Sequence, residues 1–124
     1  CDVLADYPAL AGRFVFHCYS EAVEVARRIL DMGGYVSFTG VVTFKNAEVI
    51  RDSARFVPED RFMVETDAPY LSPVPVRKIF PNEPAFVAHT AKYIAELRGV
   101  TLEQLAEQTT RNARRFYGLP ERDT

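Results

Sequence analysis

Short apolar runs and amphipathic segments alternate along the chain. Runs typical of buried strands lie at 13–17, 35–38 and 61–66. After each of them, apolar residues recur at helical spacing, most clearly in the segment after Ser20 and in the segment 46–56. Because strands separated by helices of ten or more residues pair in parallel, the pattern predicts an α/β fold with three parallel strands.

Start and stop signals mark the predicted helices. Ser20 is the expected N-cap of the first helix, and Asn82 is the expected N-cap of the helix that follows the third strand. The sequence TLEQ at 101–104 is a capping box that opens the last helix, which Gly118 closes. A proline-rich loop at 68–81 separates the third strand from the last two helices.

Composition narrows the class of protein. The 124 residues fit one domain, residues 1–124, of which 48% are hydrophobic and 26% charged. The net charge of −2 gives no sign of a strongly basic nucleic-acid binder, although an enzyme needs only a few cations beside a phosphate. The two cysteines suggest no disulfide framework, and no apolar run is long enough for a membrane span. We therefore expect a cytoplasmic protein without a membrane partner.

The candidate chemistry lies where the first and third apolar runs end. Glu65 and Asp67 follow the third run directly, and His17 follows the first. Parallel α/β folds carry their catalytic groups at the carboxyl ends of strands, so His17 and Asp67 are candidate ligands of one metal site. Taken alone, each has an ordinary structural explanation, since Asp67 could cap a turn and His17 could be a packed residue at a strand end.

The number of strands bears on the domain itself. Three parallel strands with both edges open make a poor independent domain, so the pattern predicts that further strands precede Cys1. We expect such a chain to self-associate or to pair with the missing half, because open edges and uncovered apolar faces seek partners.

Several ordered motifs resemble the TatD family of metal-dependent deoxyribonucleases. The resemblance covers nearly the whole chain, from about Arg13 to Tyr117. The motifs are HCYS at 17–20, YVSFTG at 35–40, TFKNA at 43–47, ETDAPYL at 65–71, PVP at 73–75 and NEP at 82–84.

This resemblance implies the C-terminal portion, about three parallel strands with their helices, of a TIM-like (β/α)8 barrel of the amidohydrolase type. His17 matches the metal-binding histidine on the sixth strand of the family, and Asp67 matches the metal-binding aspartate on the eighth. The other ligands of the family, a His-x-His pair, a glutamate and another histidine, have no counterpart in this sequence. His89 lies in a helix and is assigned no metal role.

The family chemistry implies a hydrolase that cleaves DNA phosphodiester bonds, from single-stranded ends, through a water activated by one or two divalent ions (Zn, Mg or Mn). Asp67 would hold a metal and position the water, whereas Arg77 and Lys78 could contact a substrate phosphate. Cys18 has no neighbour in sequence that lowers its pKa, so an inert thiol is favoured over a nucleophile. Two alternatives stay open: another amidohydrolase chemistry on esters, lactones or phosphotriesters, and a truncated domain without activity. With two protein ligands, the chain by itself is expected to be inactive.

Overall fold

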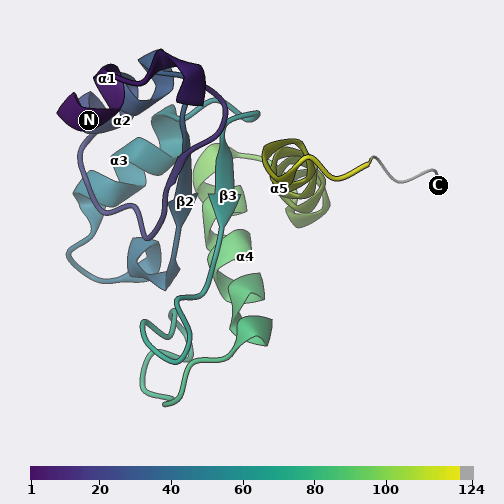
Figure 1. The fold of residues 1–124 in the computed structure, drawn as a ribbon. Helices are drawn as coiled ribbons and strands as arrows, with labels where there is room; N and C mark the ends of the chain where they lie inside the picture. The colour runs from purple at the N-terminus through teal and green to yellow at the C-terminus, as the bar shows by residue number, and fades with distance from the viewer. Residues whose placement is uncertain (121–124) are drawn as a thin grey trace.

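Three short parallel strands form the sheet of this protein, which Figure 1 shows in a computed structural model that describes residues 1–120. The strands are β1 (Val15–Phe16), β2 (Tyr35–Phe38) and β3 (Phe62–Val64). They are hydrogen-bonded in the order β1-β2-β3, with Val15 opposite Tyr35 and Val36 opposite Phe62. Each strand lies within its predicted apolar run, so the predicted α/β fold with three parallel strands is confirmed.

Helices connect the strands and follow the last of them. The α-helices are α1 (Asp2–Ala5), α2 (Val23–Asp31), α3 (Glu48–Phe56), α4 (Val87–Arg98) and α5 (Leu102–Tyr117). Short 3-10 helices are η1 (Pro8–Leu10), η2 (Gly40–Thr43) and η3 (Pro84–Phe86). The predicted capping box is confirmed: Thr101 and Gln104 exchange side-chain and backbone hydrogen bonds at the start of α5, and Gly118 ends that helix with φ of 67°.

The predicted capping of the first helix by Ser20 is wrong. Helix α2 begins at Val23, and Ala22 is its N-cap residue. The reason is the neighbouring Tyr19, whose ring is buried and whose hydroxyl donates a hydrogen bond of 2.6 Å to the carbonyl of Ala22. This bond ties Tyr19 to Ala22, and the helix begins only after it.

One face of the sheet carries the main hydrophobic core. Val36, Phe38 and Phe62 are fully buried there. The helices that cover this face contribute Ala26 and Ile29 of α2, Ile50 and Ala54 of α3, and Ile94 and Ala95 of α4. The sheet and three helices therefore fix the positions of the strand ends.

The opposite face of the sheet lines a cavity of about 520 Å³. Val15, Ser37 and Met63 contribute to its wall from the three strands, and Thr109 and Ala113 contribute from α5. Helix α5 is tied to β3 by Asn112, which is buried and donates hydrogen bonds to the carbonyls of Phe62 (2.8 Å) and Glu59 (2.7 Å). The carbonyl of Phe62 in β3 therefore receives its hydrogen bond from a side chain of α5 and not from a neighbouring strand.

Candidate metal site at the carboxyl edge of the sheet

His17 and Asp67 lie at the same edge of the sheet. His17 directly follows β1, and Asp67 is the third residue after β3. Because β1 and β3 both run parallel to β2, their carboxyl ends point in the same direction. Both residues are exposed, and 79% of the His17 side chain is accessible. The edge thus offers an imidazole and a carboxylate to solvent.

Glu65 joins the two outer strands at this edge. Its Oε2 accepts a hydrogen bond of 3.1 Å from the backbone N–H of Cys18, which is 47 positions earlier in the sequence. Its Oε1 lies 3.9 Å from Nδ1 of His17. The Glu65 side chain is three-quarters buried, so its bond to Cys18 forms with little competition from water, whereas the His17 side chain on its other side is exposed. Glu65 therefore fixes the segment that carries His17 relative to the segment that carries Asp67.

The backbone turns sharply at both strand ends. Cys18 has φ of 50° and Asp67 has φ of 56°, a left-handed conformation that non-glycine residues seldom adopt. Such conformations persist where surrounding contacts hold them, and the Cys18 amide is held by Glu65. The chain consequently changes direction sharply soon after β1 and β3. The turn after β1 is at Cys18, the residue next to His17, and the turn after β3 is at Asp67 itself.

Cys18 is not an activated nucleophile. Burial raises the pKa of its thiol, a contact with Thr39 opposes the shift, and the negative charges of Asp67 and Glu65 reinforce it. The sulfur lies 3.9 Å from the Thr39 hydroxyl oxygen. A thiol with a raised pKa stays protonated at neutral pH, in agreement with the inert role expected from the sequence.

The donor types at this edge fit a divalent cation, but their number is incomplete. Imidazole nitrogen and carboxylate oxygen are common ligands of Zn²⁺, and carboxylates also suit Mg²⁺ and Mn²⁺. Within residues 1–120, no group of three or more His, Cys, Asp and Glu side chains is arranged to hold a metal ion. His17 and Asp67 therefore fit as part of a ligand set whose other members lie elsewhere.

Asn82 organises the loop that contains Asp67, a role that the sequence did not predict. Its side chain is buried and donates to the carbonyls of Thr66 (2.8 Å) and Tyr70 (2.6 Å), on either side of Asp67. The predicted capping by Asn82 is wrong, because its Oδ1 accepts a hydrogen bond of 2.9 Å from the neighbouring N–H of Glu83, and α4 begins five residues later, at Val87, with Phe86 as its N-cap. The closest signal in the sequence was the position of Asn82 directly after the proline-rich loop at 68–81. An asparagine at such a position is equally suited to cap a helix.

Arg77 and Lys78 lie on the loop that follows Asp67. Both are exposed. The guanidinium carbon of Arg77 lies 4.2 Å from the centroid of the Phe44 ring, a cation–π contact. In the part of the chain that the structure describes, no hydrogen bond or ion pair joins Arg77 or Lys78 to His17 or Asp67. Among the described residues, the structure therefore shows no direct polar contact between this basic pair and the two candidate ligands.

Replacing Glu65 should loosen the β1 end of the site. We expect Glu65→Ala to speed hydrogen exchange of the Cys18 amide about tenfold or more, because a hydrogen bond to a charged acceptor contributes roughly 1.5–3 kcal/mol. Glu65→Gln, which keeps an acceptor oxygen, should have a smaller effect. NMR-detected exchange measures both, with Glu21→Ala, an exposed glutamate before α2, as the control. Unchanged exchange at Cys18 in Glu65→Ala would show that the Glu65 contact does not hold this turn.

The comparisons with known proteins agree with this fold. The fold is that of an α/β protein similar to two solved structures. One is the TatD homologue YjjV from Escherichia coli K12, with a TM-score of 0.86, 24% identity, and coverage of 96% of this chain and 45% of that one. The other is a TatD-family hydrolase from Entamoeba histolytica, with a TM-score of 0.78, 19% identity, and coverage of 94% and 46%.

Sequence comparison identifies the family. The model of the TatD-related DNase family matches residues 1–118, and the chain belongs to this family. The resemblance expected from the motifs is therefore confirmed.

Curated relatives share substantial identity with the chain. It is 53% identical over 105 residues to the uncharacterized metal-dependent hydrolase YcfH of Escherichia coli K12, which covers 85% of the chain and 39% of YcfH. It is 42% identical over 117 residues to the uncharacterized metal-dependent hydrolase YabD of Bacillus subtilis, covering 94% and 46%. The chain thus spans less than half the length of these relatives.

No helix among residues 1–120 has the length and apolar character needed to cross a membrane.

Proposed function

We propose that this chain is the C-terminal portion of a TIM-like (β/α)8 barrel whose function is metal-dependent hydrolysis of phosphodiester bonds in DNA. The observation that carries the proposal is the placement of His17 and Asp67 at one edge of a parallel sheet, in a chain of the TatD-related DNase family. The names of the relatives, which describe metal-dependent hydrolases, support the reaction class.

His17 and Asp67 are the proposed ligands of a divalent ion. A bound divalent ion would lower the pKa of water toward neutrality and polarise a phosphoryl oxygen. Nδ1 of His17 lies 3.9 Å from Oε1 of Glu65, so Nε2 is the nitrogen that we assign to the metal, and Glu65 is the proposed acceptor for the Nδ1 proton once the site is complete. Asp67 is the proposed group that positions the attacking water and accepts its proton.

The remaining ligands must come from other parts of a complete barrel. A catalytic site has three or more protein ligands, and a whole (β/α)8 barrel needs roughly 250 residues. The relatives are more than twice as long as the segment that this chain matches. We accordingly propose that the chain alone is inactive, and that strands and ligands outside it complete the site.

The test of this function uses the complete barrel that contains this sequence. The metal-stripped protein is reloaded separately with Zn²⁺, Mg²⁺ or Mn²⁺ and assayed on single-stranded DNA, duplex DNA, and small esters, lactones and phosphotriesters. We expect metal-dependent cleavage of DNA, and chelation should abolish it. Turnover of the small substrates without cleavage of DNA would replace the nuclease by another amidohydrolase-type reaction.

We also propose that the isolated chain self-associates, or pairs with the missing half, through the outer edges of β1 and β3. These two strands are the edges of the sheet in the described residues, and unpaired backbone groups at sheet edges bind other strands. Light scattering of the purified chain should give a mass above the monomer value of 14.0 kDa. A monodisperse monomer that unfolds cooperatively would show that the chain covers its own edges.

A further inference from the structure

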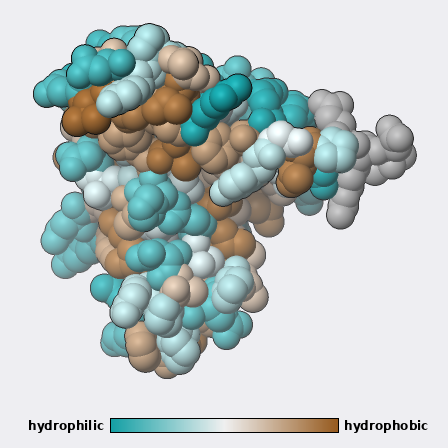
Figure 2. Space-filling model, in the orientation of Figure 1, coloured by the Kyte–Doolittle hydropathy of each residue, from teal (hydrophilic) through white to brown (hydrophobic). Residues whose placement is uncertain are grey.

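The loop at 68–81, which directly follows Asp67 and is called the Asp67 loop below, buries few side chains. Among its residues only Ser72 and Pro73 are buried, whereas Tyr70 is 63% exposed. In Figure 1 the Asp67 loop forms the end of the molecule opposite α1, and Figure 2 shows hydrophobic and hydrophilic surface interleaved at that end. Because the loop has little buried apolar surface, its position depends on specific contacts with its neighbours.

The Asp67 loop rests on residues 40–47, which follow β2 and are called the η2 segment below. The backbone N–H of Val74 donates to the hydroxyl oxygen of Thr43, at 2.9 Å. Gly40 packs so closely on the loop that an added Cβ would lie 2.6 Å from the carbonyl oxygen of Leu71. The cation–π contact described above joins the same two stretches of chain. Three contacts of different kinds thus place the Asp67 loop on the η2 segment.

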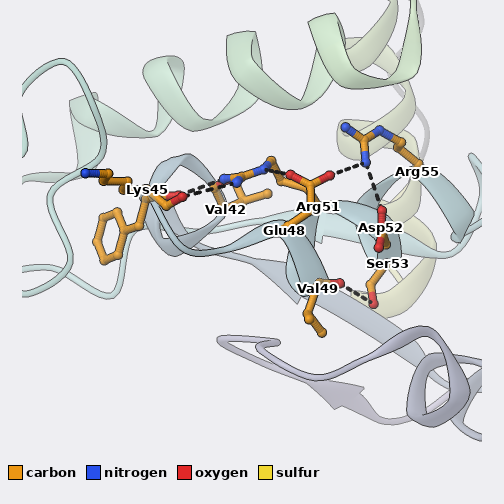
Figure 3. Close-up of polar contacts among 9 residues, drawn as sticks. Val42, Lys45, Glu48, Val49, Arg51, Asp52, Ser53 and Arg55 are labelled. Carbon is orange, nitrogen blue, oxygen red and sulfur yellow. Dashed lines mark hydrogen bonds and ion pairs between the residues drawn. The ribbon is translucent and has the colours of Figure 1, made fainter.

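Arg51 of α3 holds the η2 segment by its backbone. Its Nη1 donates to the carbonyls of Phe44 (2.7 Å) and Val42 (3.2 Å), and its Nη2 donates to the carbonyl of Lys45 (3.5 Å). Figure 3 shows these bonds, while the Lys45 side chain points away from the guanidinium. Only 11% of the Arg51 side chain is exposed, so its bonds form with little competition from water.

A second arginine of the same helix has no such bonds to the η2 segment. Glu48 lies 2.9 Å from Nε of Arg51 and 3.1 Å from Nη1 of Arg55, so its carboxylate pairs with both arginines (Figure 3). Arg55 also pairs with Asp52, at 3.0 Å. Among the described residues, the Arg55 side chain donates only to these two carboxylates of its own helix. Arg51 therefore differs from Arg55 by its bonds to backbone outside the helix.

Helix α3 also contacts the chain that follows His17. The Ser53 side chain is completely buried, and its hydroxyl donates to the carbonyl of Glu21, at 2.9 Å. The same hydroxyl lies 3.4 Å from the carbonyl oxygen of Val49 in the preceding turn (Figure 3). Glu21 is four residues beyond His17. One helix thus supports the chain after β1 through Ser53 and the chain after β2 through Arg51.

We propose that Arg51 is a positioning residue of the candidate metal site. Its guanidinium holds the η2 segment, the η2 segment supports the Asp67 loop, and that loop begins at the left-handed turn of Asp67. A turn of this kind persists only where its surroundings hold it. Among the described residues no polar contact joins Arg51 to Asp67 directly, so the effect is transmitted through the two segments. The inference rests on the proposed function only where it assigns Asp67 to a metal.

The role of Arg51 requires a guanidinium. This group has five N–H donors in a planar fork, so it can serve the carbonyls of the η2 segment and the carboxylate of Glu48 at the same time. A lysine ammonium is a point charge on a flexible stem and cannot span acceptors on different sides. Removal of the guanidinium leaves backbone acceptors of the η2 segment without this donor, and the segment should then shift or become mobile.

Hydrogen exchange in the metal-free chain tests whether Arg51 and the Asp67 turn are coupled. The N–H of Phe44 reports on the η2 segment, and the N–H of Val74 reports on its contact with the Asp67 loop. The N–H of Tyr70 donates to the carbonyl of Asp67 at 2.9 Å and reports on the turn itself. We expect Arg51→Gln to speed exchange at all three amides, by about tenfold or more at Phe44.

Two further variants separate this coupling from a general loss of stability. Arg55→Gln is the matched control, and it should change none of the three rates by more than about twofold, because exposed ion pairs contribute little. Thr43→Val keeps the shape of the side chain and breaks the bond to Val74 without altering α3. It should speed exchange at Tyr70 and reduce the additional effect of Arg51→Gln there, as expected for residues that act through one connection.

Metal affinity of the complete barrel gives a second readout that does not depend on hydrolysis. Calorimetric titration of the metal-stripped protein with Zn²⁺ or Mn²⁺ measures the dissociation constant without substrate. Arg51→Gln should raise this constant about tenfold or more, as is typical for residues that orient metal ligands. Arg51→Lys should restore only part of the affinity, and Arg55→Gln should leave it unchanged. Circular dichroism confirms that each variant is folded.

Three results would overturn the inference: unchanged exchange at Tyr70 in both Arg51→Gln and Thr43→Val, equal responses to Arg51→Gln and Arg55→Gln, or unchanged metal affinity in Arg51→Gln. None of them bears on whether the complete barrel cleaves DNA. A nuclease whose metal affinity ignores Arg51 would retain the proposed function and lose only this positioning role. Conversely, a barrel that meets these expectations and hydrolyses no DNA would contradict the function alone.

Discussion

Asp67→Asn should remove at least 99% of the hydrolytic activity of the complete barrel while leaving its fold intact. The substitution takes away one charged ligand and the group that we assign to orient water, and the loss of such a group commonly costs about 10²-fold or more. Asp67 is exposed, and its side chain makes no hydrogen bond within residues 1–120, so the fold does not depend on its charge. Asparagine also tolerates the left-handed backbone found at this position.

The measurement is steady-state cleavage of single-stranded DNA at saturating metal, accompanied by metal content and thermal unfolding. Asp6→Asn is the matched control, since Asp6 is an exposed aspartate at the opposite end of the strands. Retention of more than about a tenth of the activity in Asp67→Asn would place Asp67 outside the groups that contact the metal and the water. A large fall in the melting temperature would instead assign Asp67 a structural role.

The sequence predicted the elements that depend on local pattern. The three apolar runs became the three strands, and the capping box at 101–104 formed as expected. The position of His17 and Asp67 at one edge also followed from sequence, because parallel pairing fixes where strands end. These features depend on residues a few positions apart, or on a rule that holds for every parallel sheet.

The features that sequence did not predict depend on contacts between distant residues. Glu65 reaches the Cys18 amide across 47 positions, and Asn112 reaches the Phe62 carbonyl across 50. Asn82 was expected to cap a helix because asparagine is among the residues preferred at N-cap positions. Its amide instead satisfies two loop carbonyls that would otherwise lack partners, a requirement that appears only once the loop is folded.

Phe38 supports the middle strand directly behind the candidate site. Its side chain is completely buried, with its ring centroid 5.9 Å from that of Tyr19 and 6.1 Å from that of Phe62, both in edge-to-face geometry. Its carbonyl accepts the N–H of Glu65 at 2.9 Å. The Phe38 ring therefore packs against the core side of β2, the strand between β1 and β3. Removal of the ring should affect both the stability of the fold and the position of Glu65.

Phe38→Ala should lower the free energy of unfolding by about 3–5 kcal/mol, the cost of the lost burial together with the cavity left behind. The same change at Phe80, which is 74% exposed, should lower it by less than about 0.5 kcal/mol. Urea denaturation followed by far-UV circular dichroism measures both, at several protein concentrations because association of the chain would raise its apparent stability. Similar losses for the two variants would contradict the structure, because they would mean that Phe38 is no more enclosed than a residue on the surface of the loop.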